Sequence, residues 1–251
     1  MKIILASKSP RRKEILQNLG VKFNIITADT DESSEIREPS ALVRELALRT
    51  GLAVAEKIAA EFCNGADDGL TDGEDILVIS SDTVVAADGE ILGKPRDLAD
   101  ARDMLSHLEG RDHSVFSGIA AILIEKGKIA KSAAESDETV VRFAPMSEGE
   151  IDFYINNESV LDKAGAYAIQ GIASAWIEKI DGDYFNVVPK GYYGNVTGQA
   201  HMREEENDNI SLMAYEQLLA FKRTVSELKL KDSEIEKILY SNAKNLCASV
   251  K

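Results

Sequence analysis

The sequence has very little cysteine and no long hydrophobic run. Among its 251 residues only Cys63 and Cys247 are cysteines, and their spacing fits neither a disulfide framework nor a metal-binding pair. A reducing compartment is therefore the environment we expect. The apolar run nearest the N-terminus is only Ile3–Ala6, so we expect no signal peptide. No segment approaches the roughly 18 apolar residues of a membrane span. We expect a cytoplasmic protein that does not bind membranes.

Positive charge is also scarce. The chain has 43 aspartates and glutamates against 29 lysines and arginines, and its formal net charge is -14. A charge this negative argues against broad binding of nucleic acid. The exception is residues 1–27, where six basic residues face the single acid Glu14. The six are Lys2, Lys8, Arg11, Arg12, Lys13 and Lys22. A basic segment in an acidic chain points to one local anionic ligand.

The stretch LASKSPRRKEIL, residues 5–16, has the pattern of a strand, a turn and a helix start. Ser9 fits the N-cap, Pro10 fits the first helical position, and Gly20 is expected to end the helix. Free N–H groups at a helix start attract anions. Arg11 and Arg12 oppose the helix dipole there, which favours an anion between them. The alternative is that both arginines are solvated or ion-paired at the surface.

Helical and extended patterns alternate up to Val188, which predicts a mixed α/β sheet. Hairpin turns are expected at 88–89, 126–127 and 181–182, where Asp-Gly or Lys-Gly separates two apolar runs. Helices are expected from Pro39, over 97–110 and over 147–157, the last with a capping box of Ser147 and Glu150. We assign residues 1–188 to one compact domain.

Residues 189–251 have a different composition. A polar, loop-like stretch is followed by a segment with apolar residues at helical spacing over 210–246. We therefore expect residues 189–251 to form a C-terminal extension with an amphipathic helix.

Three residues outside the basic segment are candidates for chemistry. Asp82 follows directly on the buried strand ILVIS, where a carboxylate could be a metal ligand or a general base, or only a turn aspartate. Lys94, in the sequence GKP, could hold a phosphate as a point charge or be a turn lysine. Gln170 lies in a loop bracketed by glycines, and its amide offers both a donor and an acceptor to a base edge.

Four motifs in this order, SKSPRR, SDTVV, GKP and DKAGAYAIQG, resemble those of Maf proteins over about residues 1–188. Maf proteins are cytoplasmic nucleoside triphosphate pyrophosphatases. The form DKAGAYAIQG is similar to the branch that acts on dTTP and UTP, whereas the 7-methyl-GTP branch has a different loop. The combination is specific, although each motif alone is weak.

The resemblance implies a mixed twisted sheet flanked by helices, with two lobes and a central cleft. It implies hydrolysis between the α- and β-phosphates of a nucleoside triphosphate, a divalent cation, usually Mg²⁺, and a homodimer. In the family this activity is linked to removal of modified nucleotides and to restraint of cell division.

The resemblance also assigns roles by position. Asp82 matches the catalytic base, and Arg11, Thr83 and Gln170 match positions tied to substrate choice. The remaining matched cleft positions are Ser7, Arg12, Glu32, Lys94 and Lys163. Among the matched residues, Glu32 and Asp82 can hold the metal because Mg²⁺ prefers oxygen ligands.

Two positions depart from the family pattern. Thr50 stands where the family usually has a lysine, and Arg49 beside it is turned by about 100° around a helix. The usual GLP after VV is replaced by PKG, residues 189–191. These departures motivate an alternative, a nucleotide-binding regulatory protein with weak or lost catalysis. A third interpretation, a purine-type editing hydrolase of related fold, would require a purine triphosphate as the best substrate.

Overall fold

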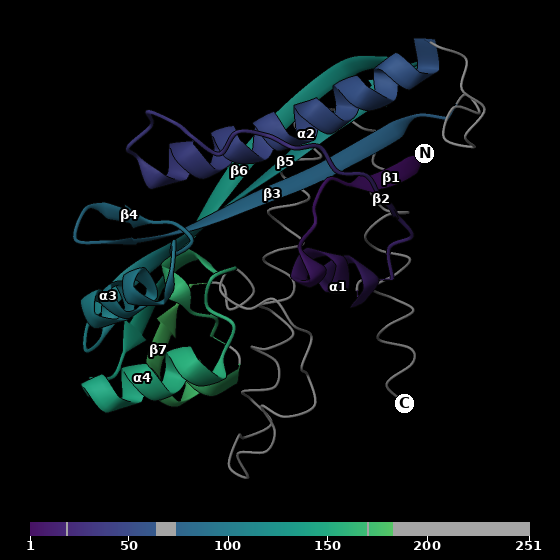
Figure 1. The fold of residues 1–251 in the computed structure, drawn as a ribbon. Helices are drawn as coiled ribbons and strands as arrows, with labels where there is room; N and C mark the ends of the chain where they lie inside the picture. Colours follow the sequence, from purple (N-terminus) through teal and green to yellow (C-terminus); the bar gives the residue numbers. More distant parts are fainter. Residues whose placement is uncertain (19, 64–73, 170, 183–251) are drawn as a thin grey trace, which may run out of the picture.

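The structure is a computed structural model that describes residues 1–18, 20–63, 74–169 and 171–182, with only the backbone of Arg11 and Asn18 (Figure 1). The expected C-terminal extension, the acidic loop at 64–73 and Gln170 lie outside these residues. The described elements, in chain order, are β1 (Lys2–Leu5), α1 (Pro10–Asn18), β2 (Asn24–Ile25), α2 (Pro39–Cys63), β3 (Ile76–Ala87), β4 (Glu90–Leu92), α3 (Leu98–Leu108), β5 (Asp112–Glu125), β6 (Lys128–Phe143), α4 (Glu148–Asn157), η1 (Ala164–Ala166), η2 (Gly171–Trp176) and β7 (Ile177–Asp181).

One mixed sheet organises the described chain, as the sequence predicted. Its strand order is β2-β1-β3-β5-β6-β7, and β4 pairs with β3 beside this path. β1 runs parallel to β2 and to β3, while the other pairs are antiparallel. The parallel strands are connected through helices, as parallel pairing requires, whereas short turns join the antiparallel pairs β3–β4 and β5–β6.

Two of the predicted hairpins are confirmed at the expected turns. Asp88 and Gly89 have φ angles of 51° and 82°, and Lys126 and Gly127 have 51° and 73°. Positive φ at both central residues is the backbone of a type I′ turn, whose twist matches that of the flanking strands. The third hairpin is described only as far as β7 and Gly182.

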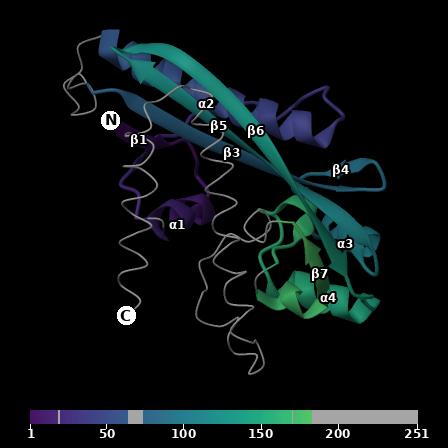
Figure 2. The same cartoon turned by 180° about the vertical axis from the view of Figure 1, so that it is seen from behind.

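The helix α2 lies along one face of β3, β5 and β6, and α1 lies on the other side of the sheet (Figures 1 and 2). Val54 and Ile58 of α2 and Ile122 of β5 are among the residues buried between this helix and the sheet. Glycine allows the close approach, since a Cβ on Gly118 would stand 2.2 Å from the carbonyl oxygen of Val43. The helix backbone therefore rests almost directly on the sheet near its middle.

A second core lies at the other end of the long strands, where α3 and α4 pack (Figure 1). Leu105 and Leu108 of α3, Tyr154 of α4 and Phe143 of β6 are all buried there. The long strands β3, β5 and β6 run from one core to the other, which gives the expected two lobes. The capping box of Ser147 and Glu150 at the start of α4 is confirmed.

One sequence expectation about β3 is wrong. Asp82 does not follow the end of a strand, because β3 continues through it to Ala87. The extension has two causes: Thr83, Val84 and Val85 are β-branched, and β5 pairs with β3 as far as Ala86. A turn or capping aspartate is therefore excluded for Asp82.

No helix among the described residues is both long enough and apolar enough to cross a bilayer.

Candidate active site

The end of β1 and the start of α1 form the first side of the site. The amide of Ala6 still pairs with the carbonyl of Ile79 at 2.8 Å, after which the chain leaves the sheet. The buried Ser7 hydroxyl accepts from the amide of Ser9 at 3.1 Å and from Arg12 Nη1 at 3.3 Å. Ser7 thus fixes both the turn before α1 and the Arg12 guanidinium group.

The same departure of β1 opens an edge of β3. On that edge β1 pairs with β3 only as far as Ile79, and β4 begins to pair at Val85. The opposite edge is fully occupied by β5. Among the described strands, β3 residues 80–84 are therefore paired on one side only. Asp82 is the middle residue of this gap.

Charged groups from three other parts of the chain lie near Asp82. Burial is the largest influence and raises the pKa of its carboxyl group above the ordinary value. Arg12 lowers this pKa, Glu32 raises it, and Lys94 lowers it, so all three are within electrostatic reach. A carboxyl group with a raised pKa, surrounded by both signs of charge, is suited to proton transfer.

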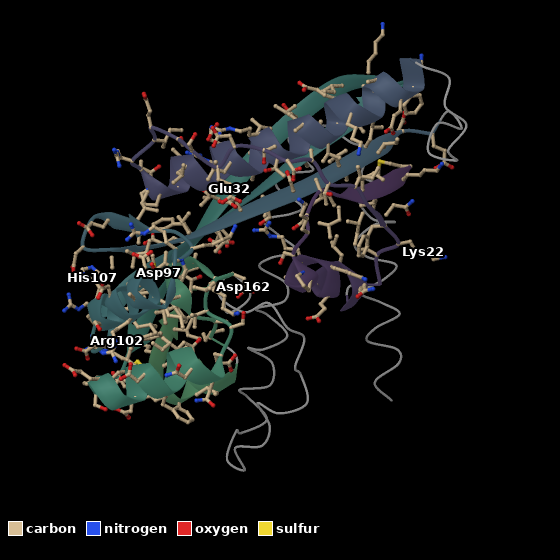
Figure 3. All side chains as sticks on the ribbon, in the orientation of Figure 1. Lys22, Glu32, Asp97, Arg102, His107 and Asp162 are labelled. Carbon is tan, nitrogen blue, oxygen red and sulfur yellow. The ribbon has the colours of Figure 1, made fainter. Side chains whose placement is uncertain are left out.

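Glu32 and Lys94 are joined by an ion pair. Lys94 Nζ lies 3.2 Å from Glu32 Oε1 and 3.4 Å from Oε2, and Figure 3 shows Glu32 between α2 and β3. The side chain of Glu32 is 69% exposed and that of Lys94 is 54% exposed, so the pair contributes at most about 1 kcal/mol to stability. A weak, exposed pair of this kind can open to other ligands at little cost.

Thr83 points away from Asp82. Successive residues of a strand face opposite sides of the sheet. The Thr83 hydroxyl lies 2.9 Å from the hydroxyl of Ser117 on β5. The structure therefore places Thr83 beside the catalytic candidate in sequence but on the other face of β3.

Lys163 is held within its own loop. Only 8% of its side chain is exposed, and its ammonium group donates to Asp162 Oδ1 at 2.6 Å and to the carbonyl of Ser159. The amide of Gly165 donates to the carbonyl of Gly93 at 3.0 Å, so this loop abuts the one that carries Lys94. Of the other predicted residues, Arg11 is described only as backbone in α1 and Gln170 lies outside the described residues.

Sequence reasoning missed the role of Arg49. Its guanidinium group donates to the carbonyl oxygens of Asp31 and Ser33, which flank Glu32. The departure at Thr50 drew attention to this part of α2, but carbonyl partners leave no trace in a sequence.

The described residues contain no group of three or more His, Cys, Asp or Glu side chains able to hold a metal ion. The carboxylates at this site are Asp82 and Glu32. Mg²⁺ is commonly bound by one or two carboxylates together with substrate phosphates, so this donor set fits that cation.

Comparison with known proteins identifies the family. Residues 2–189 match the family described as Maf-like protein. The dTTP/UTP pyrophosphatase of Caldanaerobacter subterraneus subsp. tengcongensis is 45% identical over 188 residues, which cover 75% of this chain and 83% of that protein. The dTTP/UTP pyrophosphatase of Thermotoga maritima is 42% identical over 188 residues, with the same coverage.

Among solved structures, a nucleoside-triphosphatase / dITP/XTP pyrophosphatase from Mycobacterium abscessus aligns with a TM-score of 0.37 and 16% identity, over 86% of this chain and 96% of that one. The sequence matches span three quarters of the chain and include each of the described site elements. The chain belongs to the Maf-like protein family.

Proposed function

We propose that the protein hydrolyses dTTP and UTP to the nucleoside monophosphate and pyrophosphate. The observation that carries the proposal is the meeting of Asp82, Glu32, Arg12 and Lys94 at the open edge of β3. Relatives at 41–45% identity that are dTTP/UTP pyrophosphatases support the same reaction. Removal of modified nucleotides and an influence on cell division, inferred from the family, remain predictions.

In the proposed reaction, Arg12 and Lys94 stabilise the charge of the phosphates and Asp82 is the general base. A triphosphate carries about four negative charges, and attack at phosphorus depends mainly on positioning and charge stabilisation. Arg12 and Lys94 bind phosphate oxygens, and the positive end of the α1 helix dipole lies at the same place. Arg11 and Lys163 are further candidates for phosphate contacts, and Ser7 holds Arg12 in place.

Asp82 accepts the proton of the attacking water. The water oxygen forms a bond to the α-phosphorus, the bond from that phosphorus to the bridging oxygen breaks, and pyrophosphate leaves with the electron pair. In the protein without metal, burial raises the pKa of the Asp82 carboxyl group, which favours uptake of a proton. Glu32 and Asp82 would hold Mg²⁺, which supplies charge neutralisation on the phosphates.

The family resemblance ties substrate choice to Arg11, Thr83 and Gln170. Of these, Thr83 contacts Ser117 on the face of β3 opposite Asp82, which makes it the weakest candidate of the three. The Gln170 amide can pair with the neighbouring N–H and carbonyl groups of uracil and thymine. A homodimer in the cytoplasm is the expected state of the protein.

The alternative is a nucleotide-binding regulatory protein with little catalysis. It is favoured by Thr50, whose hydroxyl contacts Thr30 at 3.3 Å where the family usually has a lysine. A purine-specific hydrolase is a third candidate.

Pyrophosphate release from all eight common triphosphates, with and without Mg²⁺, separates these candidates. We expect turnover that requires Mg²⁺ and is fastest with dTTP and UTP. Binding without turnover would support the regulatory protein, and a purine triphosphate as best substrate would support the purine hydrolase.

A further inference from the structure

The metal candidate Glu32 lies on a segment without regular structure. Residues 26–38 connect β2 to α2 and contain neither helix nor strand. The side chain of Glu32 is 69% exposed, and it pairs with the exposed Lys94. A carboxylate must be held within about 0.5 Å of its working position to serve a site well. Something other than secondary structure must therefore fix this segment.

Arg49 on α2 makes the required contacts. Its Nη1 donates to the carbonyl oxygen of Asp31 at 2.5 Å and to that of Ser33 at 2.8 Å. These are the residues immediately before and after Glu32. One guanidinium nitrogen therefore holds the backbone on both sides of the candidate metal ligand.

Glu45 fixes the guanidinium group in turn. It lies one helical turn before Arg49, and its Oε1 accepts from Arg49 Nε at 2.9 Å and also from Nη2. Each side chain is 33% exposed, so this pair is better shielded than the Glu32–Lys94 pair. Both bonds end on the same carboxylate oxygen, and the third guanidinium nitrogen, Nη1, is left to donate to the segment.

Neighbouring contacts hold the same segment. The carboxylate of Asp31 accepts from the amide and the hydroxyl of Ser33, at 2.8 and 2.6 Å. The hydroxyls of Thr30 and Thr50 lie 3.3 Å apart. Adjacent residues of α2, Arg49 and Thr50, thus both contact the segment.

We propose that Arg49 is a positioning residue that holds Glu32 for metal binding through the carbonyl groups of Asp31 and Ser33. The inference rests on the proposed function of this site, in which Glu32 is a metal ligand. It also explains why Arg49 does not replace the lysine usual at position 50: its charge and donors are engaged with Glu45 and the segment.

The test compares Arg49→Gln and Arg49→Lys with the wild-type protein. Arg49→Lys keeps the charge but not the fork of donors, so it should resemble Arg49→Gln rather than rescue it. Arg142→Lys is the matched control, because Arg142 also bridges two partners, Asp112 and Glu178, but on β6. Folding of each variant is checked by circular dichroism.

Mn²⁺ binding is measured by electron paramagnetic resonance with a non-hydrolysable dTTP analogue, which requires no turnover. We expect both Arg49 variants to weaken Mn²⁺ binding by about 10- to 100-fold, the usual cost of losing a residue that orients a metal ligand. Hydrogen exchange of amides in residues 29–35 should accelerate while that of α2 does not. The Mg²⁺ concentration for half-maximal pyrophosphate release should rise in parallel, and the control should leave all three readouts unchanged.

The outcomes are separable. Wild-type protein that binds Mn²⁺ but releases no pyrophosphate would refute the proposed function and leave the role of Arg49 standing. Faster exchange with unchanged Mn²⁺ binding would make Arg49 a structural anchor only and overturn the inference. Unchanged exchange and binding in a folded Arg49→Gln variant would overturn it as well.

Discussion

Asp82, which is half-buried, and His113, which is buried, are two titratable groups with different surroundings. In both, burial is the main cause of a shifted pKa, which is raised for Asp82 and lowered to about 4 for His113. Asp82 lies at an open strand edge, within reach of Arg12, Glu32 and Lys94. His113 is packed between two aromatic rings in the second lobe.

The contacts of His113 are those of a core residue. Its Nε2 is hydrogen-bonded to the Tyr167 hydroxyl at 2.6 Å, and its ring meets Phe143 and Tyr167 edge-on. Its Nδ1 is buried and has no hydrogen-bond partner among the described residues. The comparison teaches that a shifted pKa marks a reactive group only where an open position and further charges accompany it.

The largest effect should come from Asp82→Asn. An amide cannot take the proton from water and is a poor metal ligand, so we expect turnover to fall by at least about 100-fold. Pyrophosphate release measures this, and circular dichroism should show an intact fold. Asp103→Asn, at an exposed position of α3, is the control and should retain full activity. Near-normal activity of Asp82→Asn would show that Asp82, like His113, is not a reactive group.

His113 should affect stability and not chemistry. Its pKa of about 4 in the folded protein lies below the unfolded value of 6.5, so the unfolded chain binds the proton first as the pH falls. Its unfavourable contribution is absent above pH 6.5, grows between pH 6.5 and 4, and reaches about 3 kcal/mol. Urea unfolding at several pH values measures this loss.

His113→Phe provides the comparison for that measurement. It removes the titrating group, so its stability should fall less steeply than that of the wild type over this pH range, whatever its absolute value. Equal slopes for the two proteins would contradict the burial of a neutral His113.

Thr50→Lys should have the smallest effect of the three, and in the favourable direction. A lysine beside the segment of Glu32 adds a cation near the tetra-anionic substrate, and a charge-assisted contact is worth roughly 1.5–3 kcal/mol. We expect kcat/KM for dTTP to rise about ten- to a hundredfold, by the same contact energy. Thr50→Met, which adds length without charge, is the control. An unchanged kcat/KM in Thr50→Lys would show that the site does not need a further cation at this position.

Local patterns predicted much of the fold. The turns at Asp88 and Lys126 and the capping box at Ser147 were readable because each depends on residues only a few positions apart. The sheet edge that opens at Asp82 was not, since it depends on where β1 stops pairing with a strand some 70 residues later in the chain.

The sequence also named candidate site residues, whose roles are proposals. The family resemblance named Asp82, Arg12, Glu32 and Lys94, and the last three lie within electrostatic reach of Asp82. Two hydrogen bonds were not predicted: the one from Lys163 to the carbonyl oxygen of Ser159, and the one from Arg49 to that of Asp31. Both use backbone carbonyl groups, which every residue has, so the sequence carries no sign of them.

The unbroken pairing of β3 with β5 has a mechanical consequence. The register runs without a shift from Ile76 opposite Ile124 to Ala86 opposite Ser114, and both lobes are attached to these strands. A hinge between the lobes would have to bend this ladder and strain many hydrogen bonds together. We therefore expect the two strands to resist bending, and any shape change on nucleotide binding to occur mainly in the loops that project from them.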